Sequence, residues 1–233
     1  MKTFVKMEAA KEMEIKMTKK ELLKRYLIFL IGLFISSLGV SFITKADLGT
    51  SPISSIPYVL SLGFPLTLGN FTIIFNVLLV LLQICILGKN FRKADLLQVI
   101  VAVLFGYFID WTMLLLSWLH PATYLLKIIF LLIGCLILAL GVYFEVFAGV
   151  IMLPGESFVR AITIRWKTDF GNTKVCFDAS MTIVAVIISL FLFHSLKGVR
   201  EGTVIAALVV GIIAKAYGSL FQRIEDIVQK KKV

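Results

Sequence analysis

Four polar or charged side chains interrupt apolar runs of this sequence: Asn76, Asp110, Asp178 and Lys215. Ionisable groups inside membrane spans are costly, usually face the interior of a helix bundle and often mark the path of a solute or ion. For Asp110 and Lys215, a structural ion pair or snorkelling to the membrane interface is an equally good interpretation. For Asp178, an ion pair with Lys174 one helical turn earlier is the simpler one. All four are candidate solute-binding residues.

Two short stretches, "GTSPISS" at 49–55 and "LPGES" at 153–157, also break apolar runs. Ser51 followed by Pro52 is typical of a helix start, because the hydroxyl can cap the helix and proline suits the first helical position. Pro154 repeats the proline, but Leu153 supplies no capping group. A helix that starts near or within the membrane presents free N–H groups and a positive dipole end to an anionic or strongly polar group.

The alternative is that both stretches are ordinary turns followed by helices at the membrane interface. Broken backbone at membrane depth is tolerated only where it is buried in protein or lines a watery cavity. Because the break occurs twice, we favour re-entrant or pocket-lining elements. The candidate binding residues of the two stretches are Thr50, Ser51, Pro52, Ser55, Pro154 and Ser157.

The composition is that of a polytopic membrane protein, since 59% of the residues are hydrophobic, 16% are charged and the mean hydropathy is +0.97. A helix needs about 20 apolar residues to cross about 30 Å of hydrocarbon. Six runs come close to this length, so the predicted fold class is an all-α transmembrane helix bundle. The predicted spans are 26–44, 70–87, 96–119, 124–144, 173–193 and 204–221.

The net charge of +10 is carried by Lys and Arg residues that gather at both termini and in short loops. Aromatic residues are not interleaved with them, so membrane topology explains the charge better than nucleic-acid binding does. The segments 51–62 and 154–168 are too short to span, and the Lys/Arg bias then places both termini in the cytoplasm. The predicted parts are a basic extension (1–25), two transmembrane halves (26–119 and 120–221) and a basic tail (222–233).

Catalysis and cofactor binding find little support in the sequence. The two histidines, His120 and His194, fall at predicted loop edges, and protease, esterase and nucleotide-binding motifs are absent from the chain. We therefore expect no enzyme activity, metal or cofactor. The three cysteines at 85, 135 and 176 fall inside predicted spans, where we expect them to be small buried residues. Glu145, at the end of the fourth span, is expected to reach solvent.

The chain contains an internal repeat. The run "GLFISSLGVSF" at 32–42 aligns with "GCLILALGVYF" at 134–144, and the same offset of 102 positions then holds without a gap. Low-complexity apolar sequence inflates such matches, but Gly, Pro, Ser and Asn are not part of that background. The matched pairs include Gly39 with Gly141, Pro52 with Pro154, Ser55 with Ser157, Asn70 with Asn172 and Asn76 with Asp178. After a three-residue shift, Gly106 matches Gly211, and Asp110 falls opposite Lys215.

Each half of the repeat contains one span, one short interrupted segment and two further spans. Three crossings are an odd number, so the second half is predicted to be inverted relative to the first, an arrangement common among secondary transporters. Asn70 and Asn172 should then lie on opposite sides of the membrane, and both are further candidate binding residues. The glycines at 32, 39, 134 and 141 are expected to allow close helix packing.

The run "LGVSFITKADLGTSPISSIPYVLSLGFPLTLGNFTIIFNVLLVLLQI" resembles the YczE/YyaS/YitT family of bacterial integral membrane proteins, particularly its YczE-like branch. The elements "LGTSP" and "LGNF" are its most specific parts. The similarity extends from Arg25 to the last span and leaves the basic extension outside. The resemblance implies a multi-pass protein of the bacterial cytoplasmic membrane, from a family often suspected of transport. It brings no established site residues.

Three hypotheses of function follow. The leading one is a secondary transporter or permease for a small polar or anionic solute. A substrate-binding membrane subunit of an ATP-driven vitamin-type uptake system also has about six spans and needs a separate energising partner. A membrane scaffold or regulatory protein could dock a partner or anionic lipid through its basic ends. The expected partners are the lipid bilayer and a small-molecule solute, with a homo-oligomer or a partner subunit left open.

Overall fold

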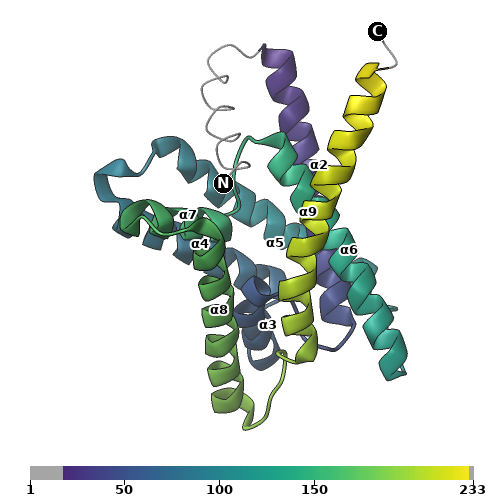
Figure 1. Ribbon diagram of the computed structural model, residues 1–233. Helices are drawn as coiled ribbons and strands as arrows, with labels where there is room; N and C mark the ends of the chain where they lie inside the picture. Colours follow the sequence, from purple (N-terminus) through teal and green to yellow (C-terminus); the bar gives the residue numbers. More distant parts are fainter. Residues whose placement is uncertain (1–17, 231–233) are drawn as a thin grey trace.

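A computed structural model describes residues 18–230 of the 233-residue chain, with side chains described through 218 and at 220. This part of the chain is helical and contains no strand (Figure 1). The helices are α2 (Lys19–Lys45), α3 (Pro52–Gly63), α4 (Leu68–Leu87), α5 (Leu97–Leu115), α6 (Tyr124–Ala148), α7 (Pro154–Trp166), α8 (Phe170–Phe193) and α9 (Glu201–Lys230), with two 3-10 turns at Gly88–Asn90 and Lys93–Leu96.

Six of these helices are long and apolar enough to cross a membrane, namely α2, α4, α5, α6, α8 and α9. Each overlaps one predicted span, so the prediction of an all-α bundle with six spans is confirmed. α2 begins and α9 ends on the same side of the molecule (Figure 1), as an even number of crossings requires. We call this side the terminal face and the other side the opposite face.

Several helix ends differ from the predicted span ends. α2 begins at Lys19, so the last residues of the basic extension continue the first span. α5 already ends at Leu115, and α6 continues to Ala148. Hydropathy marks the apolar part of a helix, whereas the helix itself ends where its backbone hydrogen bonds end. Residues 1–17 of the extension and 231–233 of the tail lie outside the described residues.

The two short helices begin where the sequence predicts. Pro52 opens α3 and Pro154 opens α7, each within the first turn where proline lacks no needed hydrogen bond. Ser51 occupies the capping position of α3, but its hydroxyl donates to Ser54 Oγ at 2.9 Å and makes no hydrogen bond to the backbone of the first turn. The predicted position of the cap is therefore correct. The predicted hydrogen bond from the hydroxyl to the helix backbone is wrong.

α2 and α6 form the central helix pair and run antiparallel. Gly32 lies against Phe144 and Gly141, while Gly134 lies against Phe42 and Ile43. A Cβ atom built on Gly39 would lie 2.4 Å from the backbone nitrogen of Leu138. Such approaches are open only to residues without a side chain. The prediction that these glycines allow close helix packing is confirmed.

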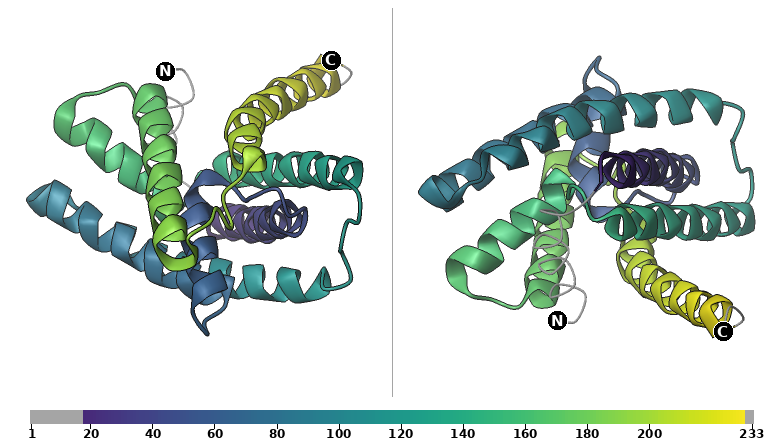
Figure 2. Two further views of the ribbon diagram at one scale, coloured as in Figure 1. Left: turned by 90° about the horizontal axis from the view of Figure 1, so that it is seen from below. Right: turned by 90° about the horizontal axis from the view of Figure 1, so that it is seen from above.

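The remaining helix contacts repeat across the two halves of the chain. In the repeat, the helices α2 to α5 correspond in order to α6 to α9. The α2–α5 contact is matched by the α6–α9 contact, and the α3–α8 contact is matched by the α7–α4 contact. Each short helix thus lies against the other half of the chain. One contact has no counterpart, because α4 packs on α5 whereas α8 and α9 share no comparable packing within the described part of the chain (Figures 1 and 2).

Large apolar side chains cover the outside of the bundle, with Phe191 81% and Leu114 71% exposed. Such a surface suits contact with lipid rather than water. It also corrects the expectation for the cysteines, because only Cys135 is buried, while Cys85 and Cys176 are exposed. Cys85 and Cys176 lie on spans whose outer surface suits lipid. Their side chains can therefore avoid water without being buried in the protein core.

The α2–α6 contact predicts a large effect of adding one methyl group. Gly39→Ala should destabilise the protein by about 1–3 kcal/mol, because the backbone of Leu138 must move to admit the Cβ atom. Thermal unfolding in detergent should show a lower Tm. Gly218→Ala is the matched control, since no described atom beyond its own helix backbone lies within 4 Å of its Cβ position. Equal Tm values for the two variants would contradict the close contact.

Candidate functional site

A cavity of about 360 Å³ lies between helices of both halves of the chain. It is lined by residues of α2 and α6, by the first turns of α3 and α7, by α4 and α8, by α9 and by Phe105 of α5. Most of its wall is apolar. This volume falls in the range of small-molecule sites, so we refer to it as the central cavity and treat it as the candidate functional site.

The wall of the central cavity is built from matched positions of the repeat. Each of the following pairs is separated by the repeat offset, and both members of each pair line the cavity. They are Ser36 and Leu138, Val40 and Val142, Ser51 and Leu153, Ile53 and Gly155, Ser54 and Glu156, Thr72 and Lys174, and Asn76 and Asp178. A single cavity lined by equivalent residues of both halves lies where the halves meet.

The charged groups of the cavity all come from the second half. Lys174 Nζ contacts the two carboxylate oxygens of Asp178 at 2.6 and 2.8 Å, one helical turn apart. The simpler interpretation of Asp178, an ion pair with Lys174, is therefore confirmed, and both residues of the pair also line the cavity. Glu156, in the first turn of α7, is the third charged residue. The first half supplies the neutral Ser54, Thr72 and Asn76 at the equivalent positions.

Glu156 was missed by the sequence reasoning. The repeat could have identified it, because Glu156 lies at the position that matches Ser54 and two residues after the proline that opens α7. Glu156 also lines a second, smaller cavity of about 140 Å³, which opens among the loops near the terminal face. Glu145, Ser157 and Arg160 line this second cavity as well. Glu156 is thus a wall residue of both cavities.

Glu145 corrects a further expectation. The sequence placed it at a span end where it should reach solvent, but it is 5% exposed. Ser36 Oγ of α2 donates a hydrogen bond of 2.6 Å to Glu145 Oε1. A buried carboxyl group needs a hydrogen-bond partner. The antiparallel contact of α2 with α6 brings this hydroxyl to it.

Two buried glutamines attach α7 to α4 and α5. Gln83 Nε2 donates to the carbonyl oxygen of Pro154 at 3.1 Å and to Gln98 Oε1 at 3.3 Å. Gln98 Nε2 in turn donates to Ser157 Oγ at 3.0 Å. Ser157 and Pro154 therefore contribute to the attachment of α7, and Ser157 lies in the smaller cavity rather than the central one. The sequence reasoning did not single out either glutamine.

Two further candidates in the first stretch lie outside the lining of the central cavity. Thr50 is fully buried, its hydroxyl lies 2.9 Å from Thr44 Oγ1, and its backbone N–H donates to Thr203 Oγ1. Ser55 is also fully buried and donates to the carbonyl oxygens of Pro52 and Met181. Of this stretch, Ser51 and Pro52 line the cavity.

The remaining candidates lie at helix contacts or helix starts. Asp110 accepts hydrogen bonds from Thr67 Oγ1 at 2.6 Å and from the backbone N–H of Gly69 at 2.8 Å, which ties α5 to the start of α4. Asn70 and Asn172 lie in the first turns of α4 and α8, where their backbone N–H groups donate to capping side chains. Lys215 of α9 is exposed, although Ala214 beside it lines the cavity.

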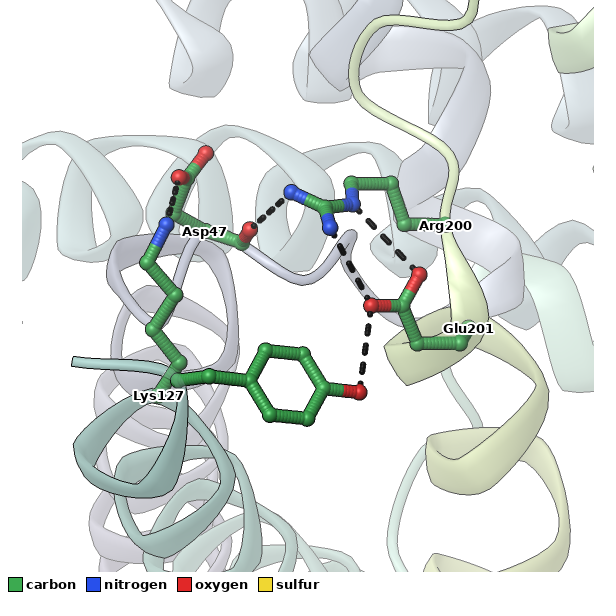
Figure 3. A network of polar contacts seen from close by, with 5 residues as sticks. Asp47, Lys127, Arg200 and Glu201 are labelled. Atoms are coloured by element: carbon green, nitrogen blue, oxygen red, sulfur yellow. Dashed lines mark hydrogen bonds and ion pairs between the residues drawn. The ribbon is translucent and has the colours of Figure 1, made fainter.

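A polar network fixes the loop that leads into α3 on the opposite face (Figure 3). Asp47 forms an ion pair with Lys127 at the start of α6. Arg200 donates to the carbonyl oxygen of Asp47 at 3.2 Å and pairs with Glu201 at the start of α9. Tyr124 donates to the same Glu201 carboxylate at 3.4 Å. The network therefore joins the α2–α3 loop to the starts of α6 and α9.

The fold and the cavity define the class of protein: a multi-pass helical membrane protein with a small-molecule-sized cavity between its two halves. The chain belongs to a family of unknown function (DUF6198), whose family model matches residues 23–219. It is 31% identical over 199 residues to the uncharacterized membrane protein YczE of Bacillus subtilis (strain 168), covering 84% of this chain and 86% of YczE.

A second relative is the uncharacterized protein YyaS of the same organism, with 24% identity over 200 residues, 85% of this chain and 94% of YyaS. No solved structure matches the chain. The expected resemblance to the YczE/YyaS group is confirmed by both comparisons. It covers both transmembrane halves and leaves out most of the basic extension.

The geometry predicts which of two adjacent serines a water-soluble reagent can reach. With the three native cysteines replaced by serine, Ser54→Cys should react with a small charged methanethiosulfonate about ten-fold faster than Ser55→Cys, because the reagent must reach the thiolate. Both side chains are buried, with 3% and 0% exposed, but Ser54 lines the central cavity and Ser55 does not. Labelling rates in membrane vesicles measure the difference. Equal rates would contradict the predicted difference, and slow labelling of both variants would show that the reagent does not reach the cavity.

Proposed function

We propose that this protein is a secondary membrane transporter and that the central cavity is its solute site. The single observation that carries the proposal is that equivalent residues of both halves line one cavity beside the starts of two broken helices. Transporter sites are typically built in this way, at the interface of two repeats and near discontinuous helices. Transport needs no catalytic group, and we propose no enzyme activity.

We further propose that the two halves are inverted repeats. The contact of Ser36 with Gly141 is matched by that of Leu138 with Gly39, which is the pairing that a two-fold axis between α2 and α6 would give. The helix starts also support inversion. α2 starts on the terminal face, whereas α6, its counterpart in the repeat, starts on the opposite face and ends on the terminal face (Figure 1).

The solute that suits this cavity is a small polar molecule. The starts of α3 and α7 both line the wall, and helix starts attract groups with partial negative charge. Lys174 is already paired with Asp178, and Glu156 adds a second carboxyl group, so the wall can accept hydrogen bonds from donor groups of the solute. The apolar remainder of the wall suits the carbon skeleton of the solute.

The proposal predicts that filling the cavity blocks transport. Ala207 lines the cavity, whereas its neighbour Leu208 is 64% exposed on the outside of α9. Untargeted comparison of metabolites inside and outside cells, with and without the protein, should reveal the transported solute. Ala207→Phe should abolish that difference and Leu208→Phe should keep it, at equal amounts of protein in the membrane. A full difference with Ala207→Phe would contradict a solute path through the cavity.

We also propose that the terminal face lies in the cytoplasm of a bacterial cell. Lys and Arg residues are concentrated at the described start of α2 and in the segments near 88–93 and 160–174, and short cytoplasmic loops carry such an excess. A green fluorescent protein fused to the C-terminus should therefore fluoresce, and an alkaline phosphatase fused there should be inactive. The reverse pattern would contradict the orientation.

A further inference from the structure

In the described part of the chain, the contact of α4 with α5 has no comparable counterpart in the second half. It is a close contact, because a Cβ atom on Gly69 would lie 2.2 Å from the carbonyl oxygen of Gly106. Asp110 secures it through the hydrogen bonds to Thr67 and to the N–H of Gly69. The starting end of α4 is thereby closed against α5.

The equivalent residues of the second half are held apart. Gly211 matches Gly106, but no described atom beyond its own helix backbone lies within 4 Å of its Cβ position. Gly171 matches Gly69 and meets only Asp169 Oδ1, at 3.2 Å. Val175 of α8 and Gly211 of α9 both line the central cavity, which therefore occupies the space between these helices. Figures 1 and 2 show α8 and α9 diverging from their connection.

The residues at the diverging ends have complementary charges. Thr67 and Asp169 are matched positions, and each caps its helix by accepting a hydrogen bond of 3.1 Å from the N–H of a matched asparagine. Asp110 secures Thr67, and the residue at its position in α9 is Lys215. The hydroxyl–carboxylate hydrogen bond of the first half would thus become a carboxylate–ammonium pair in the second. Asp169 and Lys215 are both exposed.

The connection between α8 and α9 can act as the pivot. Ser189 holds it by accepting from the N–H of Lys197 at 2.7 Å and by lying within hydrogen-bond distance of two carbonyl oxygens of the connection. His194 and Gly198 have φ values of 51° and 79°. Arg200, next to the pivot, is fixed to the α2–α3 loop. One end of the α8–α9 pair is therefore anchored, while the other end is open.

We propose that α8 and α9 close on each other at their open ends, through a Gly171–Gly211 contact and an Asp169–Lys215 ion pair. Closure would seal the central cavity on the terminal face, and the structure holds the open arrangement. Lys215 is then a residue of the closing contact rather than of the solute site. The inference rests on the repeat relation and deepens the proposed transport function by naming the helices that gate it.

Disulfide trapping tests the closure directly. In the full chain with the native cysteines replaced by serine, Asp169→Cys with Lys215→Cys should cross-link when membrane vesicles are oxidised with copper phenanthroline. Thr67→Cys with Asp110→Cys is the positive control, because those side chains touch in this structure. Asp169→Cys with Ile213→Cys is the negative control, since Ile213 faces the other side of α9. A 169–215 pair that stays reduced while the 67–110 pair cross-links would overturn the proposal.

A second measurement leaves Asp169 in place. In the Ser54→Cys background, Lys215→Gln should raise the labelling rate of the cavity cysteine, because the closed arrangement loses its ion pair. Lys215→Arg should keep the original rate. A rate unchanged by Lys215→Gln would overturn the role of the ion pair. Neither readout measures transport, so a positive cross-link, combined with no metabolite difference caused by the unmodified protein, would refute the transporter and leave the closure standing.

Discussion

The close antiparallel contact of α2 with α6 is the constraint on which the rest of the structure depends. Helices in a bilayer gain little from the hydrophobic effect and associate through close packing instead. Gly39 and Gly141 let the two backbones approach. Because α3 follows α2 and α7 follows α6, the chain enters the two short helices from opposite ends of this helix pair. Their starts nevertheless meet, since a Cβ atom on Gly155 would lie 1.9 Å from Ile53 Cδ1. Both starts then line the same cavity.

The two halves share their positions in the cavity wall but not their chemistry. Ser54 and Asn76 of the first half face Glu156 and Asp178 of the second. A charge at membrane depth needs a partner, and Lys174 supplies it for Asp178. One half of the wall is therefore neutral, whereas the other carries the Lys174–Asp178 ion pair and Glu156. A solute bound between the two halves would contact neutral polar groups on one side and charged groups on the other.

Much of this architecture could be predicted from the sequence, because six long apolar runs and two prolines at matched positions are local signals. Asn76 and Asp178 could be singled out as polar residues inside apolar runs at matched positions, and both line the cavity. Glu145 could not be placed, since its burial depends on the hydroxyl of Ser36 on a distant helix. Gln83 and Gln98 were not predicted either, because the groups that they bind, on Pro154 and Ser157, also belong to a distant helix. Hydropathy reports how polar a residue is and leaves open which partner the fold brings to it.

The difference between the packed α4–α5 pair and the separated α8–α9 pair calls for a physical cause. The fold itself accommodates the packed arrangement, as α4 and α5 demonstrate. The contacts that decide between the two arrangements are a few hydrogen bonds and one surface ion pair, each worth about 1 kcal/mol or less in net free energy. Two arrangements so close in energy can both be populated. A bound solute that contacts α8 and α9 unequally in the two arrangements would then be sufficient to shift the balance between them.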